Sequence, residues 1–90
     1  MTFTWDPNKA SANLRKHDVD FREAATVFDG PLSTTFPDRE HSLSERRFVT
    51  VGMSARGRVL VVVHTDVGEA TRIISAREAT RAEQKFYEEN

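Results

Sequence analysis

The sequence contains no cysteine, and this absence excludes several kinds of chemistry. Without a thiol there is no disulfide framework, no cysteine nucleophile and no zinc site built on cysteine ligands. A chain that needs no disulfide suits a reducing compartment, so a cytoplasmic protein is expected. No apolar run approaches the roughly 20 residues that a membrane helix requires, and the N-terminus lacks the basic and apolar blocks of a signal peptide. Neither membrane insertion nor export is therefore expected.

A second domain is also excluded. Ninety residues are too few to build two independent hydrophobic cores, so we expect a single domain over residues 1–90. The chain is 38% hydrophobic and 30% charged, which are ordinary proportions for a globular protein and argue against intrinsic disorder.

Neither sign of charge dominates the chain, but the charged residues are unevenly distributed along it. The net charge of -1 argues against a generally basic nucleic-acid binder. Residues 39–58 nevertheless carry five arginines and only two glutamates, and arginines outnumber lysines ten to three in the whole chain. Arginine binds phosphate through two parallel hydrogen bonds. The basic segment therefore fits a phosphate-binding surface or, equally, a solvated face crossed by ion pairs.

Two helices are predicted in the first third of the chain. Asp6 and Pro7 provide an N-cap followed by proline at the first helical position, so a helix begins there and ends near His17. Asp20 caps a second helix, and Glu23, three residues later, completes an acidic variant of the capping box. An apolar stripe at helical spacing marks this second helix: Phe21, Ala24, Ala25 and Phe28.

The rest of the chain predicts a sheet followed by one more helix. Residues 32–36, 47–53 and 71–75 indicate strands, and Phe3 and Trp5 suggest a short edge strand. Residues 59–65 are nearly all apolar and β-branched, which predicts a central strand covered on both faces. Ser75-Ala76-Arg77-Glu78 matches a capping box and predicts the start of the last helix. The predicted fold class is therefore α+β, with two N-terminal helices, a mainly antiparallel four-stranded sheet and a C-terminal helix.

A combination of short motifs spans almost the whole chain. The motifs are Trp5-Asp6-Pro-x-Lys9, Asn13-Leu14-x-Lys16-His17, Phe21-x-x-Ala24, Val27-Phe28, His41-Ser42, Glu45-x-Arg47, Val51-Gly52-x-Ser54, Gly57-Arg58 and Arg72-Ile-Ile-Ser-Ala-Arg77. In this order they resemble the BrnT family of bacterial type II toxins. The resemblance implies a RelE-like fold and a ribonuclease activity that arrests growth by cutting RNA.

The same resemblance implies a partner. A BrnA-type antitoxin is expected to neutralise the chain, and its ribbon-helix-helix part would bind operator DNA, which the chain would reach only through that antitoxin. A hetero-tetramer of the two proteins is the expected assembly. One departure from the family pattern stands out: an arginine is expected in a Thr-x-Arg-Gly turn, yet Val67 occupies its place. The alternative function is therefore a catalytically weak module that holds the antitoxin and regulates the operon.

Chemistry can be considered separately from the resemblance. Ribonucleases that use no metal activate the ribose 2′-hydroxyl, so they need a proton acceptor, a proton donor and cations for the charged phosphorane. The three histidines, His17, His41 and His64, are far apart in sequence and show no spacing typical of metal ligands. Neither a metal nor another cofactor is therefore expected, and His64, near the end of an apolar strand, is expected to be a packed or rim residue.

Several candidates each allow two interpretations. His17 is either a cap at a helix C-terminus or an acid–base catalyst, and Glu45 is either a general base or the ion-pair partner of Arg47. Arg77 falls in the first turn of the predicted last helix, where an acidic residue is preferred, which suggests an anion site with Ser75 and Arg72. The alternative pairs Arg77 with Glu78, and Arg81 with Glu83.

Each candidate has an assigned role. The candidate catalytic residues are His17, Glu45, Arg47, Arg72 and Arg77. The candidate RNA-binding residues are Lys16, His41, Arg46, Arg58, Ser75 and Tyr87. Of the two aromatic candidates for stacking on a base, Trp5 is expected in the core and Tyr87 could face either way.

Overall fold

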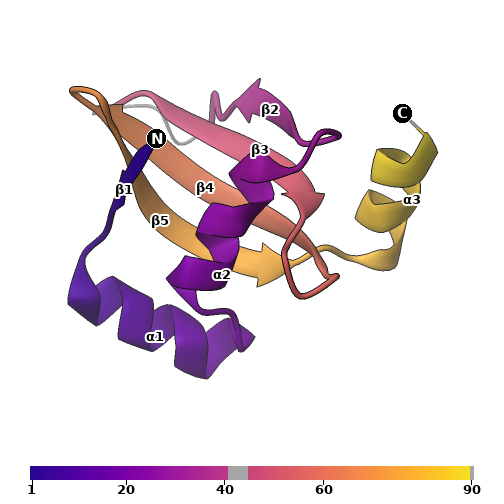
Figure 1. The fold of residues 1–90 in the computed structure, drawn as a ribbon, viewed down its shortest axis with the longest axis horizontal. Helices are drawn as coiled ribbons and strands as arrows, with labels where there is room; N and C mark the ends of the chain where they lie inside the picture. Colours follow the sequence, from indigo (N-terminus) through magenta and orange to yellow (C-terminus); the bar gives the residue numbers. More distant parts are fainter. Residues whose placement is uncertain (41–44, 90) are drawn as a thin grey trace.

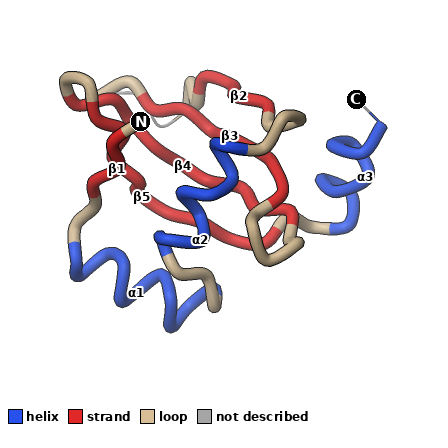
Figure 2. The backbone as a smooth tube through the Cα atoms, viewed as in Figure 1, coloured by secondary structure: helices blue, strands red, loops and turns tan. Residues whose placement is uncertain are grey.

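The computed structural model describes residues 1–40 and 45–89, which form one sheet with helices at both ends of the chain. The elements in chain order are β1 (Thr2–Thr4), α1 (Pro7–His17), α2 (Phe21–Thr26), a 3₁₀ turn η1 (Val27–Asp29), β2 (Thr34–Pro37), β3 (Arg47–Met53), β4 (Val59–Val67), β5 (Ala70–Glu78) and α3 (Arg81–Glu89). Figures 1 and 2 show α2 in front of the sheet, α1 below it beside β5, and α3 beyond one end of it. No helix in the described ranges is long and apolar enough to cross a membrane.

The sheet confirms the predicted α+β class and corrects the number of strands. Its five strands lie in the order β1-β5-β4-β3-β2, and all neighbours are antiparallel except β1 and β5. The fifth strand is β1, which pairs with β5 from Thr2↔Ala70 to Thr4↔Arg72. In the sequence, β1 and β5 are separated by both N-terminal helices and the other strands, so no local pattern indicates that they pair in parallel.

Local signals define α1 as predicted. The Asp6 carboxylate accepts a hydrogen bond from the Asn8 amide at 2.8 Å, and Pro7 occupies the first helical position. At the other end, the Asp18 amide donates to the Leu14 carbonyl at 2.9 Å, with Asp18 in the left-handed conformation at φ 57°. Aspartate tolerates this conformation better than most residues, so α1 ends at His17.

One face of the sheet is covered by α2, with α1 beside it at the edge of β5, and we call it the helix face. Its core is fully buried and joins the second helix to the central strands: Val19, Phe21, Ala24, Val27, Leu60, Val62, Ile73 and Ala76. Trp5 packs on this core as expected, with its ring 6.0 Å from that of Phe21 in an edge contact. Burial of these side chains is the main force that holds α2 on the sheet.

The opposite face, which we call the cleft face, carries the alternate residues of the same strands. Val59, Val61 and Ala79 are buried here, with Val49, Val51 and Tyr87 packed against them. Because Tyr87 belongs to α3 and Val59 and Val61 to β4, α3 covers only one end of this face. Two hollows lie on this face, lined by residues of the strands and of α3.

The start of the last helix differs from the prediction. Ser75, Ala76, Arg77 and Glu78 do not cap a helix; they continue β5, where Arg77 pairs with Val61 and Glu78 with Leu60. The capping box lies five residues later: the Thr80 amide donates to Glu83 Oε1 at 2.8 Å, and the Glu83 amide donates to Thr80 Oγ1 at 3.2 Å. Pairing with the long strand β4 extends β5, and α3 begins at Arg81.

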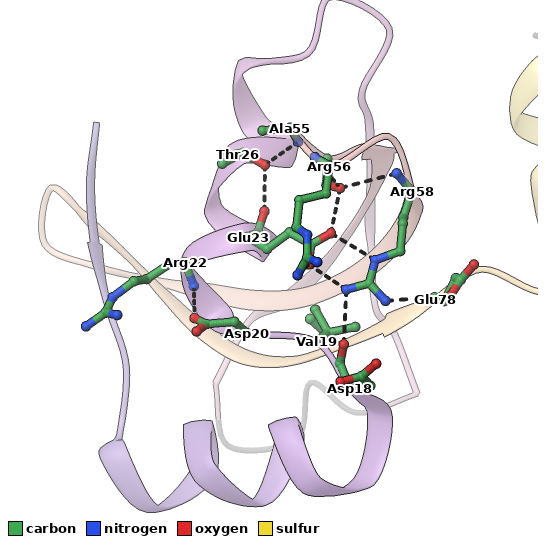
Figure 3. A network of polar contacts seen from close by, with 12 residues as sticks. Asp18, Val19, Asp20, Arg22, Glu23, Thr26, Ala55, Arg56, Arg58 and Glu78 are labelled. Carbon is green, nitrogen blue, oxygen red and sulfur yellow. Dashed lines mark hydrogen bonds and ion pairs between the residues drawn. The ribbon is translucent and has the colours of Figure 1, made fainter.

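The predicted capping role of Glu23 is also wrong. Its carboxylate is buried, with the side chain 4% exposed, and accepts hydrogen bonds from Arg58 Nε at 3.0 Å and from the Ser54 hydroxyl at 2.7 Å. Figure 3 shows this network joining α2 to the turn between β3 and β4. The hydrogen bond from Arg58, assisted by that from Ser54, holds the pKa of Glu23 below its usual value.

His64 is a packed residue on the helix face, as predicted. It is 5% exposed and lies between the rings of Phe28 and Phe48, at centroid distances of 4.8 and 5.9 Å. Its Nε2 is 2.7 Å from Thr50 Oγ1, while its Nδ1 has no hydrogen-bond partner among the described residues. Burial lowers the pKa of His64, partly opposed by the charge of Asp66, so the ring is neutral near pH 7.

Candidate active site

A cleft of about 530 Å³ opens on the cleft face between the end of α1 and the start of α3. Valines of β3 and β4 form its apolar floor, and polar side chains from β5 and both helices form its walls. The lining residues are His17, Val49, Val61, Val63, Ser75, Ala76, Arg77 and Glu83. Three sequence-predicted site residues, His17, Ser75 and Arg77, are thus brought together from positions up to 60 residues apart.

Asn13 explains how the end of α1 reaches this cleft. Its side-chain amide donates to the Ala76 carbonyl at 2.8 Å, and its carbonyl oxygen accepts from the Ala76 amide at 3.0 Å. It therefore pairs with β5 as a neighbouring strand would, at a point beyond the short strand β1. Asn13 also donates to the Val19 carbonyl at 3.0 Å and is 6% exposed. This fixed docking places His17, one turn later, beside the cleft.

Arg77 is held at the cleft by α3. Its Nη1 and Nη2 donate to the two carboxylate oxygens of Glu83 at 2.7 and 2.9 Å, and Nη1 also approaches the Glu78 carbonyl at 3.4 Å. The proposed pairing of Arg77 with the Glu78 carboxylate is therefore replaced by a bidentate pair with Glu83. This pair holds the pKa of Glu83 at about 2. Arg77 lies on β5 and not in the first turn of a helix, so the predicted conflict with the helix dipole is wrong.

A second polar cluster lies on the cleft face, two residues further along β4 than Val63. Thr65 pairs with Arg47 on one side and with Arg72 on the other, so both arginines flank one residue of β4. Glu45 bridges them: its Oε1 is 3.3 Å from Arg47 Nε and its Oε2 is 2.7 Å from Arg72 Nη2. The predicted ion pair of Glu45 with Arg47 is confirmed, and Arg72 is an additional partner.

The strand register relates this cluster to the cleft. Val63, which lines the cleft, pairs with Ser75 and Val49, and Thr65 is two residues further along the same strand. Two residues of a strand span about 7 Å. Arg47 and Arg72 therefore lie about 7 Å along the sheet from Ser75. Arg77, which pairs with Val61, lies about the same distance from Ser75 in the opposite direction. The row of positive groups follows β5 along the cleft.

Other predicted site residues lie elsewhere. Arg58 belongs to the Glu23 network on the helix face, where its Nη2 also donates to the Asp18 carbonyl at 3.0 Å. Arg46 is exposed, with its guanidinium carbon 5.9 Å from the ring centroid of Phe48. Lys16 is exposed on the last turn of α1, and His41 lies outside the described residues.

Two residues that matter for this geometry were not among the predicted site residues. Asn13 positions His17, and Glu83 holds Arg77. A signal for Asn13 exists in the sequence, because asparagine is unfavourable in a helix interior and stands next to the apolar Leu14. For Glu83 the signal is the Thr80-x-x-Glu83 capping box, which matches the same pattern as Ser75-x-x-Glu78.

The described part of the chain places no three His, Asp or Glu side chains close enough to share a metal ion. The groups that converge on the cleft face are instead cations, a hydroxyl, an imidazole and carboxylates. Such a set can bind a phosphate and move protons.

The fold and the cleft define a small α+β protein with a site suited to phosphate binding, and comparison with known proteins identifies its family. Residues 5–83 match the family model described as the ribonuclease toxin BrnT of type II toxin-antitoxin systems. The structure resembles the crystal structure of the Brucella abortus ribonuclease toxin BrnT with a TM-score of 0.71 and 26% sequence identity, covering 90% of this chain and 99% of that one. No curated protein sequence matches. The chain belongs to the BrnT family of ribonuclease toxins, and membership in a type II system implies a cognate antitoxin.

Proposed function

We propose that this chain is an endoribonuclease that cuts cellular RNA in the cytoplasm without a metal ion and so arrests growth. A BrnA-type antitoxin would neutralise it in a hetero-tetramer and carry it to operator DNA. The observation that carries the proposal is the arrangement of Arg47 and Arg72 on either side of Thr65, bridged by Glu45, next to a cleft that contains His17. Fixed guanidinium groups supply the positive charge that a phosphorane requires.

In the proposed reaction, the ribose 2′-oxygen attacks the adjacent phosphorus and the bond to the 5′-oxygen breaks. Arg47 and Arg72 bind the non-bridging oxygens, whose charge increases in the transition state. A phosphate at this position competes with Glu45 for both guanidiniums. Displacement from them leaves the Glu45 carboxylate beside the substrate, where it accepts the 2′-hydroxyl proton.

The same scheme assigns a role to the other end of the cleft. His17 is held beside Ser75 and Arg77 by the docking of Asn13, so it lies on the far side of the phosphate from Glu45. Two proton-moving groups on opposite sides of the phosphate suit an in-line displacement, in which one accepts a proton while the other donates one to the leaving 5′-oxygen. Arg77 and the Ser75 hydroxyl bind a neighbouring phosphate of the strand.

The proposed function predicts defined RNA ends. Induced expression of the chain alone is expected to stop growth, and co-expression of the adjacent antitoxin gene is expected to restore it. Purified protein should cut RNA in excess chelator and leave a 2′,3′-cyclic phosphate and a 5′-hydroxyl, because arginines supply the positive charge and the 2′-hydroxyl is the nucleophile. The measurement is mapping of RNA 5′ ends with and without chelator. Cleavage that stops in chelator and returns with one divalent ion would contradict the proposal.

A charge exchange tests Arg77 separately from the stability of α3. Arg77→Glu places two carboxylates together, so α3 should loosen and RNA cleavage should fall at least about tenfold. Arg77→Glu/Glu83→Arg restores an ion pair in the opposite order. We expect its melting temperature to return to that of the parent, whereas cleavage stays low because a carboxylate now replaces the phosphate-binding cation. The pair is partly exposed, so its contribution to stability is below about 1 kcal/mol. Recovery of cleavage in the exchanged protein would limit Arg77 to a structural role.

A second candidate function is an antitoxin-binding module with weak catalysis. The observation that favours it is Val67, which is 52% exposed, pairs with Ala70 and replaces the arginine expected from the family pattern. Thr65 and Val67 point to the same face of β4, so an arginine there would add a third cation beside Arg47 and Arg72. RNA cleavage measured on the purified chain separates the two functions.

A further inference from the structure

An apolar groove lies between α3 and the neighbouring strands on the cleft face. Its volume is about 800 Å³, and the lining residues are Thr34, Phe36, Pro37, Asp38, Val49, Val51, Val61, Ala82, Glu83, Phe86 and Tyr87. Val49, Val61 and Glu83 also line the candidate active site. The groove and the cleft are therefore continuous, and an occupant of one lies at the entrance of the other.

The groove walls expose large apolar side chains. Phe86 of α3 is 62% exposed and Phe36 of β2 is 39% exposed. No residue of α3 in the described range is buried, although the helix has an apolar stripe that includes Ala82 and Phe86. Two exposed phenylalanines on opposite walls of one groove are typical of a binding surface rather than of scattered surface residues.

The charges of the groove do not suit RNA. Among its lining residues in the described chain there is no lysine or arginine, and there are two carboxyl groups, those of Asp38 and Glu83. RNA binding depends on cations that neutralise phosphates, and here the cations lie in the cleft instead. An apolar groove that lacks cations, and whose Glu83 carboxylate is already paired with Arg77, fits the apolar side of an amphipathic protein segment.

We propose that this groove is the docking site of the cognate antitoxin, which inserts an amphipathic segment with apolar side chains between Phe36 and Phe86. The existence of the antitoxin follows from membership in the type II family. The consequence for catalysis depends on the proposed function: a segment in the groove ends beside Arg77 and blocks the cleft from the α3 side. Neutralisation then needs no contact with Glu45, Arg47 or Arg72.

Single arginine substitutions test this surface. Phe86→Arg and Phe36→Arg each remove an apolar wall and add a positive charge, while Leu32→Arg makes the same change at a 70% exposed leucine outside the groove. The affinity of each purified variant for the protein encoded by the adjacent antitoxin gene is measured by calorimetry, and RNA cleavage and thermal melting are measured on the same samples. We expect both groove variants to bind at least about tenfold more weakly, with cleavage unchanged, and Leu32→Arg to bind like the parent.

Each outcome decides the proposal. Unchanged affinity of both groove variants would overturn it, as would an equal loss in Leu32→Arg, which would indicate a general effect of charge. Loss of RNA cleavage with antitoxin affinity retained would assign the groove to the RNA instead. If Phe86→Arg melts early, Phe36→Arg carries the test, because it lies on a different element. A parent protein that cuts no RNA would defeat the proposed function while leaving the calorimetric result intact.

Discussion

Arg72→Gln is expected to lose about 100-fold or more in the rate of RNA cleavage while melting at nearly the temperature of the parent. The Arg72 side chain is 39% exposed, and its ion pair with Glu45 is 30% exposed on the carboxylate side. Exposed pairs of this kind contribute about 0 to 1 kcal/mol to folding. By contrast, removing one group that stabilises transition-state charge costs a factor of about 100 to 1,000.

The measurement separates kcat from KM on a single-stranded oligonucleotide. A fall in kcat assigns Arg72 to the transition state, whereas a rise in KM alone assigns it to general RNA binding. Arg22→Gln is the matched control, because Arg22 is an exposed arginine of α2, the helix that packs on the opposite face of the sheet. Equal losses in both variants would indicate a dependence on total positive charge, and full activity of Arg72→Gln would remove the residue from the site.

Glu23→Ala is expected to lower the free energy of unfolding by about 3 kcal/mol, which corresponds to a fall of more than about 10 °C in melting temperature. The substitution leaves the Arg58 guanidinium, 23% exposed, without its main partner, and it leaves the Ser54 hydroxyl without its acceptor. Among the described residues, Arg58 keeps only the Asp18 carbonyl at 3.0 Å and the more distant Glu78 carboxylate at 3.7 Å. A partly buried charge that loses its partner accounts for most of the effect.

Two comparisons complete this experiment. Glu69→Ala, at an exposed glutamate in the turn between β4 and β5, should change stability by less than about 0.5 kcal/mol. The pKa of Glu23 is lowered in the folded protein, so its contribution is present above the ordinary glutamate pKa of about 4.5 and is lost as pH falls through the folded value. Below pH 4.5, the free energy of unfolding of Glu23→Ala should therefore depend less on pH than that of the parent. A loss of under 1 kcal/mol in Glu23→Ala would show that the pair behaves like a surface salt bridge.

The predicted elements that proved correct depend on short-range chemistry. Asp6 and Pro7 start α1, Asp18 ends it, and alternating apolar residues mark β3 from Arg47 to Met53. These features need only neighbours in sequence, because caps, turns and strand alternation act within a few residues. The ion pair of Glu45 with Arg47 belongs to the same class, since the two residues are two positions apart.

The site residues were only partly predictable for the opposite reason. His17, Ser75, Arg77, Arg47 and Arg72 were all identified as candidates, and the structure places them along one face of the sheet. Their grouping depends on strand register and on Asn13, whose carboxamide joins α1 to β5 across 63 positions of sequence. Register cannot be read from one strand, because both partners determine it.

The last helix shows where the sequence by itself stopped being decisive. Two similar motifs, Ser75-x-x-Glu78 and Thr80-x-x-Glu83, can each begin a helix, and local chemistry favours the first as much as the second. Only the tertiary structure decided between them, because residues 76–78 gain strand pairing with β4 that an isolated helix turn cannot match. The sequence alone determined the fold class, the first helix and the types of residue available for catalysis. Long-range pairing of β4 with β5 determined that Arg77 lies in the cleft facing Glu83. Packing of α2 against the turn between β3 and β4 determined that Glu23 is buried against Arg58, since these contacts form only after distant segments pack.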